Sequence, residues 1–466
     1  MKGMGTTRRK VLGGGLLVPL LVVALAACED LLEVDLPGSV TSDALDDAQL
    51  AETLVLSAQG DFECGFVDYM RFPGQWFEEF QNSSQSRPDA LSGLRSALVA
   101  VYADPCDSGT GPIWVTIQLP RQQGQRAYDI ISEFDPSQVN GKDFLLAKAR
   151  FYEAYSIQLL AEQFCSVTFD AGALMTPAQA YDSAVVKFTE AISLADASIA
   201  AATRVAEATA VRYGSYVGRA RARMYLGDAA GSIADATLVS NASAAVFNEY
   251  LATYDGNPGR RRNRIFEINN TGNAMMPHRD FTNLTINPAN GLTFDPATGE
   301  HLSGVGVPDP RVVVTIGPEP DPRGFTLYRR QRKYWASSNA AGYAVDIPFA
   351  TWREARLMIA EQDPAQSVSI INELRRTIRG LPAGVSGAAL LQVPLLDATA
   401  LTTPEQIALA VREERRRELW MQGTQAGDKV RWSFPAWDAA DEYGQALGAG
   451  GCMPLPYLEE TSNPNL

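Results

Sequence analysis

The side chains that most often perform catalysis are sparse in this chain. Only two histidines occur, His278 and His301, which leaves little material for a histidine-based metal site or a histidine-activated nucleophile. No GxSxG elbow or P-loop is present, and the glycine-rich run 448–451 lacks the lysine and hydroxyl that cradle a phosphate. We therefore predict no enzyme activity, no cofactor and no metal site.

Carboxylates are plentiful, and a glycosidase needs only two of them across a cleft. Glu414 and Glu418 share one face of a predicted helix, but the arginine run 415–417 lies between them. Glu413 and Arg417 attract each other at i, i+4. Such a run is typical of a solvated face or a structural ion-pair network. A surface glycosidase stays open as an alternative class of function.

The first 28 residues indicate the lipidation of a thiol. Basic residues at 2 and 8–10 precede an apolar run, 11–27, that is too short and too rich in glycine for a comfortable membrane span. Leu25-Ala26-Ala27-Cys28 resembles a bacterial lipobox, in which small residues admit the peptidase and the cysteine accepts the lipid. We predict a signal peptide over 1–27 and lipidation of Cys28, with an uncleaved anchor as the alternative. Each buried acyl methylene contributes about 0.8 kcal/mol, so the anchoring would be effectively permanent.

Two further features bear on export. Residues 7–12 (TRRKVL) resemble a twin-arginine signal, although an ordinary basic region before the apolar run explains them equally well. Glu29-Asp30 resembles the acidic tag that directs some bacterial lipoproteins to the cell surface.

Composition indicates a folded body and argues against nucleic acid as a partner. Removal of residues 1–27 leaves 439 residues and moves the formal charge from −14 to −18, which repels phosphate backbones. Hydrophobic residues make up 46% of the chain, enough for a large core. No later segment reaches eighteen consecutive apolar residues, so we expect a soluble body on a lipid tether.

Four more cysteines occur, at 64, 106, 165 and 452, in a compartment that permits disulfides. None forms a CxxC pair, and four cysteines allow three connectivities. We favour Cys64 with Cys106 and Cys165 with Cys452. Buried free thiols are the alternative.

The spacing of apolar residues predicts a mainly α-helical protein. Helical patterns cover 48–63, 113–134, 144–165, 178–201, 206–226, 229–239, 349–362, 366–379 and 404–422. Helix breaks fall at Gly172, near Ala201 and at Gly227-Asp228. The small residues Ala220 and Ala222, followed by the glycine turn, resemble a tetratricopeptide helix pair.

The segment 251–350 differs from the rest because it holds ten of the 27 prolines. We predict loops with short strands there, and loops on a helical scaffold commonly carry binding residues. The expected organisation is a tether over 28–47, a helical tetratricopeptide-like scaffold over 48–245, a loop-rich ligand-side region over 246–348, and C-terminal helices with a surface tail over 349–466.

Ordered motifs run along the chain. Helix 147–164 carries Phe151, Tyr152 and Tyr155, residues 353–361 read REARLMIAE, and 371–375 read INELR. Residues 411–419 read VREERRREL and are followed by Gly423, Asp428 and Arg431-Trp432, and the chain ends in PLP, Glu459 and NPNL. In this order, after the lipobox, these motifs resemble the SusD/RagB family of outer-membrane nutrient-binding lipoproteins. Phe-Cys-Ser-Val at 164–167 replaces the family's glycine-and-proline bend, and Thr424 replaces an arginine. These departures suggest a divergent branch, whose ligand need not be starch.

The resemblance implies a SusD-like fold and a location in the outer membrane, lipid-anchored and facing the cell exterior. It implies that the protein binds oligosaccharides and delivers them to a SusC-like TonB-dependent barrel. Sugar rings are held by flat aromatic side chains with polar partners. The family's site regions correspond here to Phe72, Trp76 and Asn82 in the segment after the first helix, and to Tyr334 and Trp335 before the C-terminal helices. Peptide cargo and a purely structural lipoprotein remain alternatives, and core packing is the alternative for each aromatic.

Overall fold

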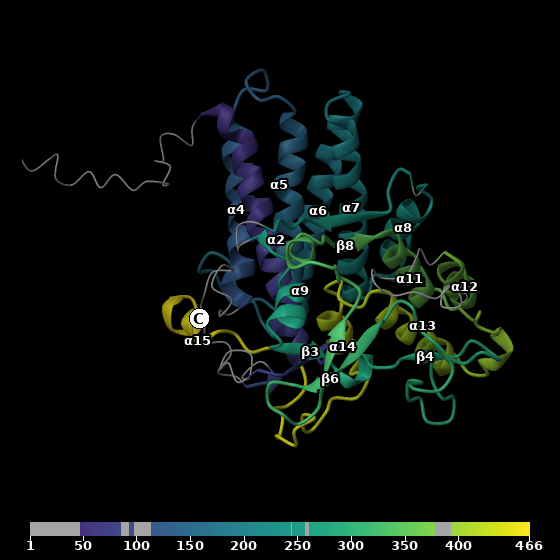
Figure 1. Ribbon diagram of the computed structural model, residues 1–466. Helices are drawn as coiled ribbons and strands as arrows, with labels where there is room; N and C mark the ends of the chain where they lie inside the picture. The colour runs from purple at the N-terminus through teal and green to yellow at the C-terminus, as the bar shows by residue number, and fades with distance from the viewer. Residues whose placement is uncertain (1–46, 85–92, 97–112, 244, 257–260, 378–392) are drawn as a thin grey trace, which may run out of the picture. The chain divides into compact units, whose positions relative to one another are not determined.

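Long helices lie side by side in the N-terminal half of the chain (Figure 1). The computed structural model describes residues 47–84, 93–96, 113–243, 245–256, 261–377 and 393–466. The long helices of these ranges are α2 (Ala51–Trp76), α4 (Ile113–Glu133), α5 (Lys142–Gln163), α6 (Pro177–Ala200), α7 (Val205–Leu226) and α8 (Ala229–Ser240). The prediction of a mainly helical protein with paired helices is confirmed. The signal peptide, residues 28–46 of the tether, Cys28 and Cys106 lie outside the described residues.

Local sequence signals explain where these helices begin and end. At the start of α6, the side chain of Thr176 accepts a hydrogen bond from the backbone N–H of Gln179, and the Gln179 side chain accepts one from the N–H of Thr176. Helix α7 ends at Gly227, whose φ of +81° favours glycine, and Asp228 then caps α8. The predicted break at these two residues is confirmed.

Close contacts between the helices depend on small residues. A Cβ atom at Gly218 of α7 would lie 2.3 Å from the ring of Phe188 on α6, so this approach requires glycine. The rings of Phe188 and Phe349 both pack on Tyr155 of α5, at centroid distances of 4.8 and 4.9 Å. Phe151 and Tyr155 are fully buried. The core of the helical half therefore includes a residue from the C-terminal part of the chain.

Helix α2 is longer than the predicted helix over 48–63, and it includes Phe72 and Trp76, which we expected to follow the helix. A 3-10 turn, η2 (Ala48–Leu50), precedes α2, which continues through Pro73 to Trp76. Gly65 looks like a helix breaker in the sequence, but a Cβ there would lie 2.4 Å from the carbonyl oxygen of Thr116 on α4. Every residue from Asp61 to Trp76 is buried. Tertiary packing thus overrides the local propensity of the glycines and the proline.

The loop-rich segment contains short antiparallel strand pairs, as predicted. In the part of the chain that the structure describes, the pairs are β1 (Phe80–Asn82) with β3 (Met275–Pro277), β2 (Glu249–Ala252) with β8 (Ile347–Thr351), β4 (Thr285–Ile286) with β5 (Val307–Pro308), and β6 (Val314–Pro320) with β7 (Leu327–Gln331). The first pair brings the segment that follows α2 beside the loop-rich region.

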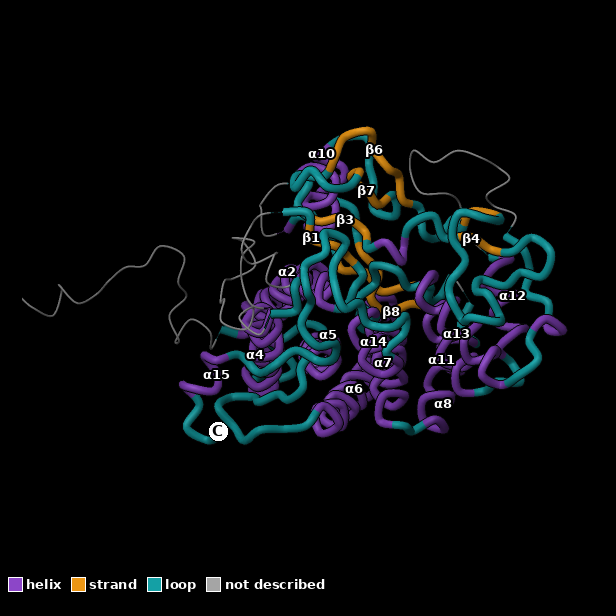
Figure 2. The backbone as a smooth tube through the Cα atoms, turned by 90° about the horizontal axis from the view of Figure 1, so that it is seen from below, coloured by secondary structure: helices purple, strands orange, loops and turns teal. Residues whose placement is uncertain are grey.

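The other helices of the described residues have at most 15 residues. They are α9 (Arg264–Phe266), η5 (Glu267–Thr271), η6 (Arg279–Phe281), α10 (Asn339–Tyr343), α11 (Trp352–Gln362), α12 (Ser367–Arg376), η8 (Ala398–Ala400), α13 (Pro404–Glu418), α14 (Gln425–Trp432) and α15 (Tyr457–Ser462). Residues 349–351, predicted to be helical, belong to β8 instead. Figure 2 shows helices α4 to α8 on one side and the pairs β1–β3 and β6–β7 on the other. Among the described helices, none is both long enough and apolar enough to cross a bilayer.

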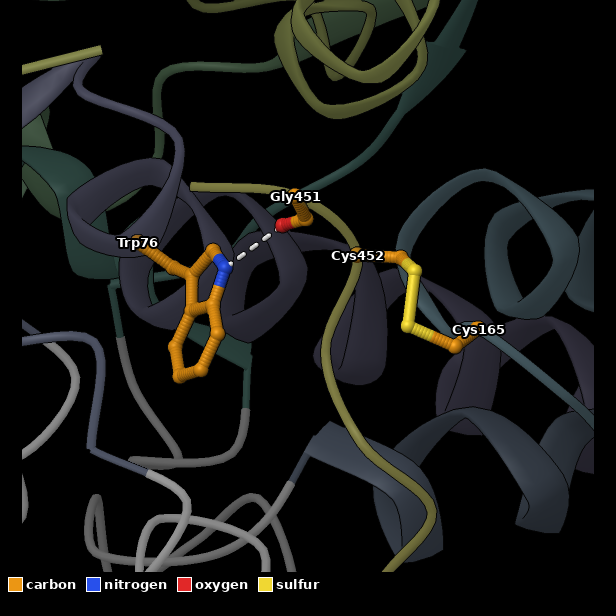
Figure 3. The surroundings of a disulfide bond; sticks show 4 residues. All are labelled: Trp76, Cys165, Gly451 and Cys452. Atoms are coloured by element: carbon orange, nitrogen blue, oxygen red, sulfur yellow. Dashed lines mark hydrogen bonds between the residues drawn. A yellow bond between two sulfur atoms is a disulfide. The ribbon is translucent and has the colours of Figure 1, made fainter. Parts of the chain in front are cut away.

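The C-terminal tail is attached to the end of α5 (Figure 3). The predicted disulfide between Cys165 and Cys452 is confirmed, with Cα atoms 5.0 Å apart. Beside it, the N–H of Met453 donates to the carbonyl of Gln163 at 2.7 Å, and the N–H of Cys165 donates to the carbonyl of Met453 at 2.9 Å. Cys64 is also disulfide-bonded, and its pairing with Cys106 stays a prediction.

Candidate functional site

The charged helix α13 carries a buried ion-pair network, not a solvated face. Glu414 is fully buried and pairs with Arg311 and Arg375 at 2.5 and 2.8 Å, and Glu418 pairs with Arg353. Burial opposes ionisation of Glu414, but the two guanidinium groups lower its pKa to about 2. Glu414 is therefore ionised at neutral pH and is unsuited to act as a general acid.

Residues that carry the family resemblance take part in the same kind of contact. The ion pairs link Arg221 to Glu354, Arg415 to Asp428 and Arg431 to Glu361, at 2.7, 2.6 and 2.6 Å. They connect α7, α11, α13 and α14; the first two pairs are buried and the third is partly exposed. These motif residues thus have structural partners, which accounts for the sequence pattern without assigning it chemistry.

Three of the predicted ligand-binding aromatics lie in the interior. Phe72, Trp76 and Tyr334 are 2%, 4% and 4% exposed. The indole Nε1 of Trp76 donates to the carbonyl of Gly451 at 2.9 Å (Figure 3), and the hydroxyl of Tyr334 donates to the carbonyl of Met421 at 2.7 Å. Stacking of these rings on a sugar stays a prediction, and it would require a change that exposes them.

Asn82 lies on β1 and is also buried. Its Oδ1 accepts a hydrogen bond from the N–H of Ser84 at 2.7 Å, while its Nδ2 is buried with no hydrogen-bond partner among the described residues. The carbonyl of Ser84 in turn accepts hydrogen bonds from Nε and Nη2 of Arg323, at 3.2 and 3.0 Å. The two predicted site regions therefore lie side by side, through the pairing of β1, which includes Asn82, with β3, and through the contact between Ser84 and Arg323. Ser84 and Arg323 were not named from the sequence.

An exposed aromatic surface lies at this meeting point, in the loop between β6 and β7. Phe325 is 72% exposed, and its ring centroid lies 5.4 Å from that of Tyr443. The guanidinium of Arg323 lies 4.6 Å from the Tyr443 ring centroid, and its Nη1 donates to Oε1 of Gln445 at 3.2 Å. We call Arg323, Phe325, Tyr443 and Gln445 the tip cluster.

The loop that presents Phe325 is fixed by one carboxylate. Asp321 accepts hydrogen bonds from the N–H groups of Arg323, Gly324 and Thr326, at 2.7, 2.9 and 3.0 Å. Burial opposes its ionisation, but the bonds from Thr326, Arg323 and Gly324 prevail and lower the pKa of Asp321. Gly324 has a φ of +80°, which suits glycine. The loop is thus ordered while the Phe325 ring remains in solvent.

A second group of polar and aromatic side chains lies at the other end of the same hairpin. Trp335, a predicted ligand residue, is partly exposed, and the guanidinium of Arg332 lies 4.6 Å from its ring centroid. Nε of Arg332 donates to Oγ1 of Thr315 at 3.0 Å. We call Thr315, Arg330, Arg332 and Trp335 the base cluster.

Phe325 and Tyr443 were missed from the sequence. The stretch 321–324 (Asp-Pro-Arg-Gly) is a strong turn signal, and the aromatic residue directly after it could have been chosen as exposed. Tyr443 belongs to no motif, and only the tertiary fold brings it to Phe325. Within the described ranges, no three His, Cys, Asp or Glu side chains come together in a way that could hold a metal ion.

The comparisons with solved structures identify the helical scaffold that carries these aromatic and arginine side chains. The chain has the SusD-like fold, which confirms the resemblance that the motifs indicated. A SusD-like protein from Bacteroides fragilis NCTC 9343 matches with a TM-score of 0.59 and 13% identity, over 92% of this chain and 98% of that one. A SusD superfamily protein from Bacteroides vulgatus ATCC 8482 matches with a TM-score of 0.62 and 14% identity, over 90% and 98%.

A laminarin-binding SusD-like protein is also similar, with a TM-score of 0.51 and 12% identity, over 89% of this chain and 97% of that one. No protein-family model matches the sequence, and no curated protein matches it. Identities this low establish the fold and leave the ligand to be inferred from the site.

Proposed function

We propose that this protein is a surface lipoprotein of a bacterial outer membrane that binds oligosaccharides and passes them to a SusC-like TonB-dependent barrel. The lipobox ending at Cys28 and the acidic pair after it support the location. Similar structures described as carbohydrate-binding support the binding role. The observation that carries the proposal is the exposed Phe325 ring beside Tyr443 and Arg323.

This arrangement suits the two surfaces of a sugar. The apolar C–H face of a pyranose can stack on the ring of Phe325, while Arg323 and Gln445 lie close enough to engage its hydroxyl groups. Hydrogen bonds to Ser84 and Gln445 already order Arg323. A site ordered before the ligand arrives loses less conformational entropy on binding. Catalysis is not part of the proposal, because Glu414 and Glu418 are held as ion pairs inside the protein.

The binding role is tested first with an array of neutral and acidic oligosaccharides, followed by calorimetric titration of the strongest binder. Phe325→Ala should weaken binding about tenfold or more, equivalent to about 1.4 kcal/mol. The matched control is Tyr457→Ala on α15, which also removes an exposed aromatic ring, 61% exposed, and should leave the affinity unchanged. Equal affinities for wild type and Phe325→Ala would reject the tip cluster as the site.

The transport role needs a separate test. The native lipoprotein would be purified from cells in mild detergent, and the co-purifying membrane proteins identified. Recovery of a TonB-dependent barrel is expected. Recovery of the intact lipoprotein without such a barrel would contradict delivery and leave a stand-alone binding protein.

A further inference from the structure

The base cluster contains two arginines, Arg330 and Arg332, and neither is closely paired with a carboxylate in the described part of the chain. In the described part of the chain, no Asp or Glu oxygen lies within ion-pair distance of Arg332. Among the described residues, its contacts are the hydroxyl group of Thr315 and the ring of Trp335. Burial and the nearby charge of Arg330 lower the pKa of Arg332 from its ordinary value. The fold therefore places two cations close together at an electrostatic cost.

Arg330 is only weakly compensated. Its Nη1 lies 3.9 Å from Oε2 of Glu319, a side chain that is 69% exposed, and its Nη2 donates to Oδ1 of Asn273 at 3.3 Å. A long ion pair with an exposed carboxylate contributes little in water. Because the whole chain carries a net charge of −14, this weakly compensated pair of arginines stands out against an acidic background.

The orientation of Arg332 suits a bidentate anion. Its Nε donates to Thr315 and its guanidinium carbon lies 4.6 Å from the ring centroid of Trp335, while among the described residues no hydrogen bond uses its Nη1 or Nη2. A guanidinium offers two parallel N–H groups that match the oxygens of a carboxylate or a sulfate. Trp335 is partly exposed and provides an apolar surface for the ring that bears such a group.

We infer that the base cluster is a subsite for a negatively charged substituent on the bound glycan, either the carboxylate of a uronic acid or a sulfate ester. This inference rests on the proposed glycan-binding function and names the class of glycan. The base and tip clusters lie towards opposite ends of β7, a strand of five residues that spans about 13 Å at about 3.3 Å per residue. An oligosaccharide, not a single sugar, would be needed to reach both.

The test uses the full mature protein and three probes of equal length, each titrated by calorimetry. The probes are laminarihexaose, which is neutral, hexagalacturonate, which carries carboxylates, and a carrageenan hexasaccharide, which carries sulfates. We expect one of the two anionic probes to bind at least about tenfold more tightly than the neutral probe at low salt. This advantage should shrink as NaCl rises from ~50 to ~300 mM, because salt screens exposed charges.

Variants assign that preference to the base cluster. Arg332→Gln should weaken the anionic probe about tenfold, and the neutral probe by a smaller factor. The matched control is Arg412→Gln on α13, which also removes an arginine near a tryptophan, 5.3 Å from the ring of Trp432, and should change neither affinity. Trp335→Ala should weaken both probes.

The outcomes separate the two proposals. If neutral and anionic probes bind equally well, or if Arg332→Gln leaves the anionic affinity unchanged, the subsite is refuted while glycan binding at Phe325 stands. If no glycan of the array binds, the proposed function fails and the subsite fails with it.

Discussion

Arg417 of α13 and Arg332 at the base of the β6–β7 hairpin lie in opposite electrostatic settings. Arg417 is fully buried, and it donates to Glu413 at 2.9 Å and to Asp309 at 3.2 Å. Two carbonyl oxygens, of Thr285 and Thr293, accept its remaining hydrogen bonds. Arg332, by contrast, has a hydroxyl group and an indole ring as its contacts.

This difference separates charge that maintains the fold from charge that is available to a ligand. A buried guanidinium is tolerated only when carboxylates and carbonyls replace its hydration. A partly exposed guanidinium keeps water on its free N–H groups and can exchange that water for an anion. The number and burial of an arginine's partners, and not the residue type, therefore indicate its role.

The largest effect on stability should follow from removing a buried, ion-paired arginine of α13. Arg417→Met removes a cation that compensates Glu413 and Asp309, so those carboxylates stay buried with fewer partners. We expect a loss of about 3–5 kcal/mol in the free energy of unfolding, measured by urea denaturation. Arg412→Met on the same helix, at a partly exposed position, should cost less than about 0.5 kcal/mol. Similar losses for both variants would contradict the structural role of the network.

Buried carboxylates with different cationic partners should differ in the sign of their pH dependence. Glu79 faces Lys333, and burial raises the pKa of Glu79 to about 7. Its folded pKa exceeds the unfolded value of about 4.3, so its contribution to stability is full below that value and is lost as pH rises towards 7. Glu79→Gln should remove this loss and stabilise the protein at pH 8 by an amount on the order of 1–3 kcal/mol.

Glu414 should behave in the opposite sense. Its folded pKa of about 2 lies below the unfolded value, so its contribution is full above about pH 4.3 and is lost as pH falls towards 2. Thermal unfolding followed by circular dichroism between pH 3 and pH 8 tests both groups. The assignment fails if Glu79→Gln and wild type lose stability in parallel between pH 5 and pH 7.

How much of the fold could be predicted from the sequence depends on how far apart in the chain the interacting residues lie. Helices α6 and α7 were predicted to within one residue at each end, because caps and apolar spacing are local. The continuation of α2 beyond Gly65 was not predicted, because it depends on the close approach of α4 at Thr116. The charge run of α13 was ambiguous for the same reason, because Arg311 and Arg375, which pair with Glu414, lie far away in the sequence.

The candidate site was also predicted only in part: its regions were predicted, but its exposed aromatic residues were not. The sequence predicted that the segment after the first helix and the loop-rich region would meet, and Ser84 and Arg323 do so. It favoured Phe72 and Trp76 as sugar platforms, yet an aromatic residue in a loop and one in a buried helical turn look alike without the tertiary structure. Phe325 and Tyr443 are adjacent only after folding.

The smallest effect on stability is expected for Arg332 at the β6–β7 hairpin. This prediction best separates an arginine that binds a ligand from one that maintains the fold. Arg332→Gln removes a cation that has no carboxylate partner among the described residues and that lies near Arg330. The free energy of unfolding should change by less than about 0.5 kcal/mol. Arg332→Glu would place a carboxylate near Arg330 and should stabilise the protein slightly, by about 0.2–1 kcal/mol, an effect that high salt removes.

Urea denaturation of the two Arg332 variants beside Arg417→Met gives the comparison directly. A loss of several kcal/mol for Arg332→Gln would mean that this arginine maintains the fold, as Arg417 does, and that the base cluster is not free to receive an anion. A negligible change in the free energy of unfolding, together with weaker binding of the anionic glycan, is the result expected of an arginine that contacts the ligand. Such an arginine has its anionic partner only in the complex, so its loss affects binding and not folding.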